Sequence, residues 1–201
     1  MPKRVIDFDA MWGADKLASC AEWAQAEYAW LYGLADASGC FELTNLRVIW
    51  GRVAAIRRVA TARVQRQYPS TLRVTVIERV PVVVKDYPDG PHLFDKDGVD
   101  FATAPPPGGV PYLDADNPGP SDAPTKAALQ VMTALRPEVA QQVGRIAAPS
   151  VAAITLTLTD GRVVVWGTTD RTEEKALKLG ALLTQPGQTY DVSSPDLPTV
   201  K

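Results

Sequence analysis

The side chains best suited to acid–base chemistry lie in one stretch that begins at the single histidine, His92. Three carboxylates follow it, from Asp95, Asp97 and Asp100. A histidine base needs a nucleophile to activate, and carboxylates that act together must converge. No serine or cysteine motif accompanies His92, and alternation along a hairpin divides the aspartates between the faces and the turn. The stretch is therefore typical of a strand edge, and we expect no enzyme here.

The metal and nucleotide motifs that the sequence could carry are incomplete. The run Asp95–Gly98 has the start of a calcium loop, but the later oxygen ligands and the closing glutamate are missing. The two cysteines, Cys20 and Cys40, leave two alternatives, a disulfide bridge or a pair of small buried apolar side chains, and we favour the second. There is no phosphate-binding glycine loop and no zinc motif. The sequence thus predicts no cofactor and no small-molecule ligand.

Composition and charge are those of an ordinary globular chain. Of its 201 residues, 46% are hydrophobic and 22% are charged, and the formal charge is −2. That charge gives no general attraction to nucleic acid or to an anionic membrane. No apolar run is long enough to span a bilayer, and no signal-peptide core is present. On this evidence alone we expect a soluble chain.

A predicted β-hairpin at residues 58–84 organises the rest of the chain. Val59 to Val64 alternate in the period of a strand, the turn residues 68–70 interrupt them, and Leu72 to Val76 resume the alternation. A hairpin alone is only marginally stable, so another element must cover its apolar face.

The first 57 residues read as a helical head. One helix is predicted from the cap Asp15 to the stop Gly39, and a second from Thr44 through Val53. The order faintly resembles the opening of a winged-helix domain, so a DNA-binding or replication-associated module stays open as the alternative function. Acidic and basic residues balance here, which favours a helical pair that only covers the sheet.

The remaining residues predict short strands with interspersed helices. The predicted elements are the hairpin 92–101, an extended loop 105–124, a helix that begins after Asp122, a short helix 139–146, the strand pair 154–166, a helix 173–183 and a last strand 189–194. The fold class is therefore α+β: a helical head on a β-hairpin, followed by a mostly antiparallel β domain with flanking helices.

Six motifs in order resemble one family over about residues 53–201. They are the hairpin 59–72, Glu78-Arg79-Val80-Pro81-Val82, Asp97-Gly98-Val99, the loop 107–113, the strand–strand–helix segment 158–183 and the strand 190–195. Together they resemble the extracytoplasmic part of the FtsQ/DivIB cell-division proteins of actinobacterial type. The hairpin resembles the closing hairpin of that family's POTRA domain.

The resemblance implies three parts, with boundaries at 57 and 85. Residues 1–57 form a head foreign to the family, residues 58–85 a POTRA remnant, and residues 86–201 the family's β domain. The family's transmembrane anchor has no counterpart in this chain. The implied place is the extracytoplasmic face of the cell membrane at the septum.

The implied function is that of a non-enzymatic divisome scaffold in septum formation. Its partners would be FtsB- and FtsL-like proteins, bound by strand addition to the C-terminal edge of the β domain. If the last strand is that edge, the implied partner-binding residues are Tyr190, Asp191, Val192, Ser193 and Ser194. Lys175 and Lys178 would place positive charge beside an acidic partner strand. The alternatives are core packing for Tyr190 and Val192 and a solvated helix face for the two lysines.

Overall fold

The computed structural model describes residues 3–9, 46–67 and 71–201. The chain forms two compact units, Met1–Arg79 and Val80–Lys201, and each is described by itself. The predicted helix between Asp15 and Gly39, the cap Thr44 and both cysteines lie outside the described residues. The three-part division at 57 and 85 stays a prediction.

The first unit contains a three-stranded antiparallel sheet in the order β1-β3-β2, with a helix beside it. The predicted hairpin is confirmed as β2 (Val59–Gln67) and β3 (Thr71–Glu78), and the second head helix as α3 (Leu46–Ala54). Helix α3 contacts β2. Among the side chains of this unit that the structure describes, the buried apolar ones are Ile49, Val53, Val59, Leu72, Val74 and Val76, each at most 2% exposed.

The expectation of an all-helical head is wrong at its start. Strand β1 (Lys3–Asp9) pairs with β3 along its whole length. Four of the seven residues in this strand are charged, so its local pattern lacks the alternation that predicts a strand. The pairing partner lies about seventy residues further along the chain, and only the tertiary structure brings the two together.

The second unit is built on a nine-stranded sheet in the order β12-β11-β10-β9-β8-β7-β4-β5-β6. Its strands are β4 (Val83–Tyr87), β5 (Gly90–Phe94), β6 (Asp100–Thr103), β7 (Tyr112–Asp114), β8 (Val143–Ala147), β9 (Ile154–Leu158), β10 (Val163–Gly167), β11 (Thr189–Asp191) and β12 (Thr199–Val200). The sheet is mixed: five of its eight strand pairs are antiparallel, as expected for a mostly antiparallel domain, and three are parallel. Strands β4–β7, β7–β8 and β10–β11 pair in parallel. Helical crossovers after β7 and β10 account for two of these pairs.

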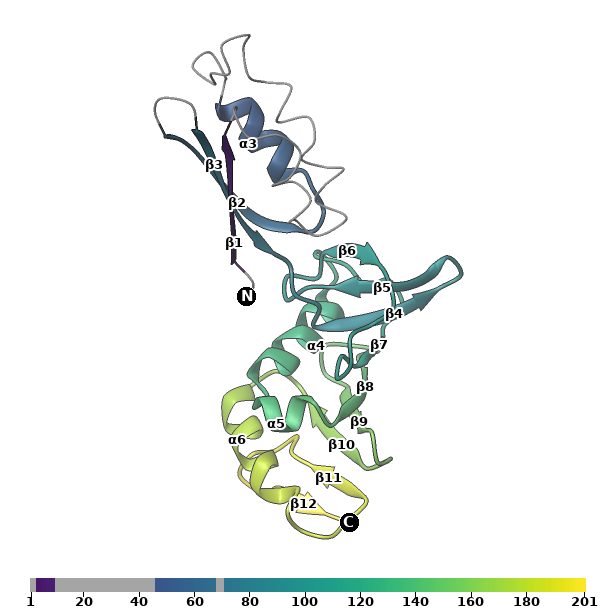
Figure 1. Cartoon of the computed structure of the whole chain (residues 1–201). Helices are drawn as coiled ribbons and strands as arrows, with labels where there is room; N and C mark the ends of the chain where they lie inside the picture. The colour runs from purple at the N-terminus through teal and green to yellow at the C-terminus, as the bar shows by residue number, and fades with distance from the viewer. Residues whose placement is uncertain (1–2, 10–45, 68–70) are drawn as a thin grey trace. The chain divides into compact units, whose positions relative to one another are not determined.

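Three helices, α4 (Ala123–Ala134), α5 (Pro137–Ala140) and α6 (Thr172–Leu182), lie on the same side of the strands (Figure 1). The predictions of α4 and α6 are confirmed. Asp122 caps α4 by accepting a hydrogen bond of 2.8 Å from the backbone N–H of Thr125. The predicted helix 139–146 is wrong, because α5 ends at Ala140 and the next apolar residues form β8. The spacing of these apolar residues suits a helix as well as a strand, and pairing with β7 and β9 makes the segment a strand.

The main core lies between this sheet and the helices. Alternate strand residues point into it, among them Leu156, Val164 and Trp166, each fully buried. The intervening residues of the same strands, such as Thr155, Thr157 and Val165, are only half-buried. Burial on the helical side therefore fixes which residues of β9 and β10 face the core.

Candidate partner-binding surface

The last predicted strand lies inside the sheet. Strand β11 pairs in parallel with β10, opposing Tyr190 to Val164, and antiparallel with β12, opposing Tyr190 to Val200. The expectation that Tyr190–Ser194 forms the free edge is therefore wrong. After Asp191 the chain turns and returns as β12, a two-residue strand that has too few residues to show a period.

Strand β12 is the edge at this end of the sheet: among the described residues it pairs with β11 alone. Thr189 and Lys201 exchange two backbone hydrogen bonds of 2.9 Å. Gly187 permits the close approach, since a Cβ at this position would lie 2.3 Å from Val200 Cγ1. Leu197, just before the strand, leaves 79% of its surface exposed.

The hydroxyl of Tyr190 holds the turn that leads into β11. It donates hydrogen bonds to the carbonyl oxygens of Gln185 and Gly187, at 2.7 and 3.1 Å. The Arg162 guanidinium donates to the same hydroxyl at 3.3 Å and pairs with Asp160 at 2.7 Å. Tyr190 is fully buried, so core packing and these polar contacts together fix the backbone beside the edge.

An ion-pair network connects α6 to the segment before β12. Arg171 donates two hydrogen bonds to Asp196, at 2.7 and 2.9 Å, and two to Glu174, at 2.7 and 3.2 Å. The hydrogen bond from Arg171 holds the pKa of Asp196 below its ordinary value. Arg171 is also the one described residue other than glycine with a left-handed backbone, at φ 52°. Lys178 donates to the carbonyl oxygen of Pro195 in the same segment.

The structure separates the residues predicted to bind a partner into two sets. Tyr190, Val192 and Lys175 are at most 1% exposed. Asp191 is half-buried, and its carboxylate accepts from the N–H and the hydroxyl of Ser193, at 2.9 and 2.6 Å. These two hydrogen bonds lower the pKa of Asp191. Ser193 and Ser194 are exposed, and Lys178 is half-buried.

Lys175 does not extend its charge toward solvent as the sequence suggested. Its ammonium donates to the carbonyl oxygens of Trp166 and Thr168, at 3.1 and 2.8 Å. Burial lowers its pKa, and the more distant charge of Asp170 opposes the shift. Lys175 therefore holds the connection between β10 and α6.

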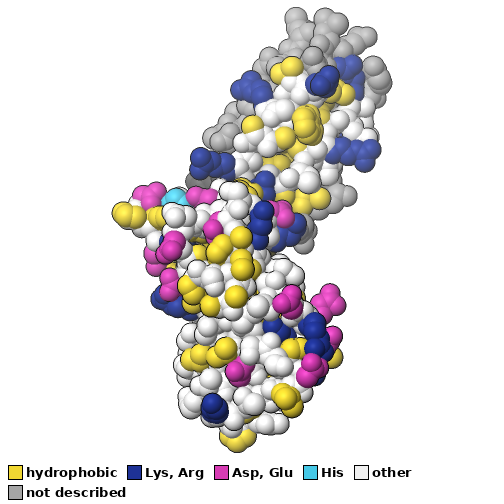
Figure 2. Space-filling view, turned by 180° about the vertical axis from the view of Figure 1, so that it is seen from behind, with side chains coloured by type: hydrophobic (Ala, Val, Ile, Leu, Met, Phe, Trp, Pro, Cys, Tyr) yellow, Lys and Arg dark blue, Asp and Glu magenta, His cyan; other side chains and the backbone are white. Residues whose placement is uncertain are grey.

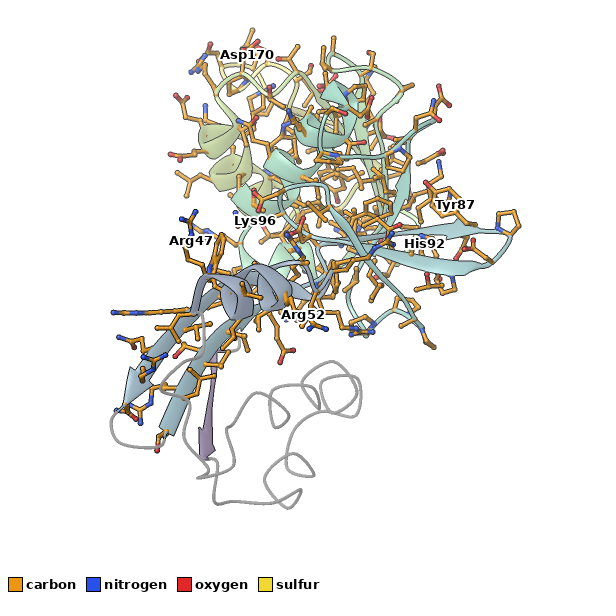
Figure 3. All side chains as sticks on the ribbon, turned by 90° about the horizontal axis from the view of Figure 1, so that it is seen from above. Arg47, Arg52, Tyr87, His92, Lys96 and Asp170 are labelled. Atoms are coloured by element: carbon orange, nitrogen blue, oxygen red, sulfur yellow. The ribbon has the colours of Figure 1, made fainter. Side chains whose placement is uncertain are left out.

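His92 lies on the β4–β5 hairpin, where Figure 3 shows it close to Tyr87. Its two ring nitrogens lie 2.7 Å from Asp100 Oδ2 and 3.0 Å from Asp89 Oδ2. The ring centroids of His92 and Tyr87 are 4.7 Å apart. The hydrogen bond to Asp100 is the largest cause of a raised pKa of His92. Because Asp89 and Asp100 contact different nitrogens of the ring, the two carboxylates hold His92 between them, and we call these three residues the His92 clamp.

Neither metal ligands nor a membrane span emerge from the part of the chain that the structure describes. Its histidine, aspartate and glutamate side chains form no group of three that could hold an ion. Within the same residues, no helix has the length and apolar character required to cross a bilayer.

The sequence signals missed Arg162, Arg171 and Asp196, which position the edge. Each is a charged residue in or beside a turn, and no local spacing connects Arg171 to a carboxylate twenty-five residues later. The sequence did place Tyr190 on a short last strand, and the structure adds that this strand lies between β10 and β12. The resulting structure is an α+β module whose sheet ends in a short, one-sided strand, a form suited to protein binding.

Comparison with known proteins gives the family. Residues 82–197 match the family described as "Cell division protein FtsQ/DivIB, C-terminal". The FtsQ cell-division protein of Mycobacterium tuberculosis (strain ATCC 25618 / H37Rv) is 82% identical over 150 residues, which cover 75% of this chain and 48% of the relative. The relative from Mycolicibacterium smegmatis is 81% identical over 150 residues, covering 75% and 45%. The relative from Corynebacterium glutamicum is 32% identical over 146 residues, covering 71% and 65%.

The chain belongs to the FtsQ/DivIB family of cell-division proteins, which are non-enzymatic proteins of the divisome. It spans about half the length of the mycobacterial relatives that it matches.

Proposed function

We propose that this chain acts in septum formation as a divisome scaffold that recruits FtsB- and FtsL-like partners by strand addition at β12. The family resemblance implies that it does so at the extracytoplasmic face of the membrane, in a protein that is membrane-anchored. The observation that carries the proposal is the one-sided pairing of β12 among the described strands. A strand with unpaired backbone groups is a template for a strand from another chain.

The register indicates which backbone groups a partner would meet. Thr189 and Lys201 form the hydrogen-bonded pair, so Tyr190 and Val200 form the adjacent pair without backbone bonds between them. The N–H and C=O of Val200 then point away from β11 and toward an added strand. The exposed Leu197 offers apolar contact beside it.

The residues predicted as partner-binding keep distinct places in this proposal. Asp191 would hold the turn between β11 and β12 through Ser193, Ser193 and Ser194 would be exposed in that turn, and Lys178 would hold the segment that leads to β12. Tyr190 and Val192 would support the edge from within the core. We assign Lys175 the same supporting role, because its ammonium is buried.

Replacing Val200 by proline tests the proposal. Proline removes the N–H that would bond to a partner, while the Thr189–Lys201 bonds need no donor from residue 200. We expect loss of binding to an immobilised extracytoplasmic FtsB–FtsL fragment, measured by pull-down, with the far-UV circular dichroism unchanged.

Val200→Ala is the matched control, since it shortens the same side chain and keeps the donor. Retained binding by Val200→Ala with lost binding by Val200→Pro supports strand addition at this edge. Equal binding by both variants and the wild type would place the partner elsewhere.

A further inference from the structure

The helical side of the second unit carries a polar groove that strand addition does not use. Two hollows of about 540 and 580 Å³ share Gln130 and Thr133 on the exposed side of α4. The first extends to Glu173 at the start of α6, and the second to Lys126 and the β5–β6 turn at Lys96. Because they share two residues, they form one groove along α4.

The two ends of this groove carry opposite charges. Arg171 in its wall already pairs with Glu174 and Asp196. No ion pair connects Lys126 or Glu173 to another residue of the part of the chain that the structure describes. On the side where α6 lies, acidic and basic side chains alternate (Figure 2). In the lining, Lys96 pairs with Asp97 and Arg171 with Glu174, so Lys126 is the extra positive charge at one end and Glu173 the extra negative charge at the other.

The chemistry of the lining favours an extended polypeptide over an amphipathic helix. Ala134 is the one apolar side chain among the lining residues, so the carbon surface of the groove comes mainly from the stems of polar side chains and forms no apolar pocket for the large side chains of a helical face. The Gln130 amide can donate to and accept from a peptide backbone, and it is exposed. The groove therefore suits main-chain hydrogen bonding.

Contacts within the chain hold the turn that opens α6, the wall of the groove. The Thr172 hydroxyl donates a hydrogen bond of 2.7 Å to the carbonyl oxygen of Thr169 and so stabilises the turn before α6. Lys175 and the Arg171 network hold the same turn from the other side. Such preorganisation lowers the ordering cost of binding.

We propose that this groove binds an extended segment of a partner protein that carries an acidic side chain at the Lys126 end and a basic side chain at the Glu173 end. The seven helical steps of α4 from Lys126 to Thr133 span roughly 10 Å, and Glu173 lines the hollow that continues from Thr133 toward α6. At about 3.3 Å per extended residue, the two charges are roughly four to six residues apart. The site is separate from β12, so a partner strand at the edge leaves it open.

Two synthetic peptides of identical composition test the inference against the full-length chain. The first, Gly-Glu-Ser-Thr-Asn-Ser-Arg-Gly, separates the charges, and the second, Gly-Ser-Thr-Glu-Arg-Asn-Ser-Gly, places them side by side. Both are capped at their ends. In an NMR titration we expect the first peptide to give saturable amide shifts at Gln130 and Thr133, and the second to give none.

Lys126→Glu removes the attraction between Lys126 and the acidic residue of the first peptide and adds a repulsion, so the affinity for that peptide should fall by about threefold to tenfold. Arg145→Glu changes an exposed charge on β8 and should leave binding unchanged. Equal shifts from the two peptides, no saturable shift at Gln130, or an unchanged affinity in Lys126→Glu would each overturn the inference.

Discussion

Replacing Lys175 by methionine tests whether this lysine supports the fold or meets a partner. The substitution removes the ammonium that donates to Trp166 and Thr168, so one buried and one partly buried carbonyl oxygen lose this donor. A buried carbonyl oxygen without a hydrogen-bond donor lowers the free energy of unfolding by about 1–3 kcal/mol. Methionine offsets part of this loss, because burying its uncharged side chain avoids the cost of desolvating the lysine ammonium. We expect a net loss of about 1–2 kcal/mol in the free energy of unfolding.

Urea denaturation measures that loss, and hydrogen exchange of residues 163–183 locates it. The matched control is Lys126→Met on α4, where an exposed lysine is replaced and a change within about 0.5 kcal/mol is expected. The pH dependence gives a second readout. The folded pKa of Lys175 is lowered, so the wild-type protein gains stability as pH rises through that lowered pKa toward 10.5, and the methionine variant lacks this gain.

Two outcomes would refute the supporting role of Lys175. One is a Lys175→Met protein as stable as Lys126→Met, with unchanged exchange in residues 163–183. The other is normal stability together with weakened binding of the FtsB–FtsL fragment, which would return Lys175 to the partner-binding residues.

Three further results are expected. Gly187→Ala should weaken the pairing of β12 with β11 by about 1–3 kcal/mol, because the new Cβ would lie 2.3 Å from Val200 Cγ1. Faster hydrogen exchange at the Thr189 amide would show this loss, and unchanged exchange would contradict the prediction. Tyr190→Phe should cost about 1–3 kcal/mol in a urea titration, because two carbonyl oxygens lose their donor; a loss below about 0.5 kcal/mol would show that water replaces the hydroxyl. The raised pKa of His92 adds stability that is full below its ordinary pKa of 6.5 and is lost as pH rises through the higher folded pKa. Asp100→Asn should therefore lower the free energy of unfolding more at about pH 5.5 than at about pH 8.5. Equal destabilisation at both pH values would count against the contact between His92 and Asp100.

Local sequence pattern was sufficient for the elements with a regular apolar period. The alternation through Ile154 to Trp166 predicts β9 and β10, and Asp122 with Pro124 predicts the start of α4. Spacing alone did not separate helix from strand at residues 143–146. Their apolar residues fit either period, and neighbouring strands settled the question.

Whether Tyr190–Ser194 bind a partner stays a prediction, and the structure bears only on the place of the last predicted strand. The motifs at 158–195 placed it at the C-terminal end of a sheet, where β11 and β12 lie. The sequence did not reveal that β12 covers β11, because a two-residue strand after Pro195 and Pro198 has no periodic signal. For the same reason Tyr190 and Val192 appeared available for binding, although both are fully buried.

By itself, the sequence determined the α+β class, the hairpin 59–78, most strands and helices of the second unit and the family to which the chain belongs. Only the tertiary structure decided that Lys3–Asp9 joins the first sheet, that Lys175 is buried and that Arg171 holds Asp196. The physical reason is the range of the interactions. Periodicity and capping act within a few residues, whereas strand order, burial of a charge and ion pairs depend on groups that meet from distant parts of the chain.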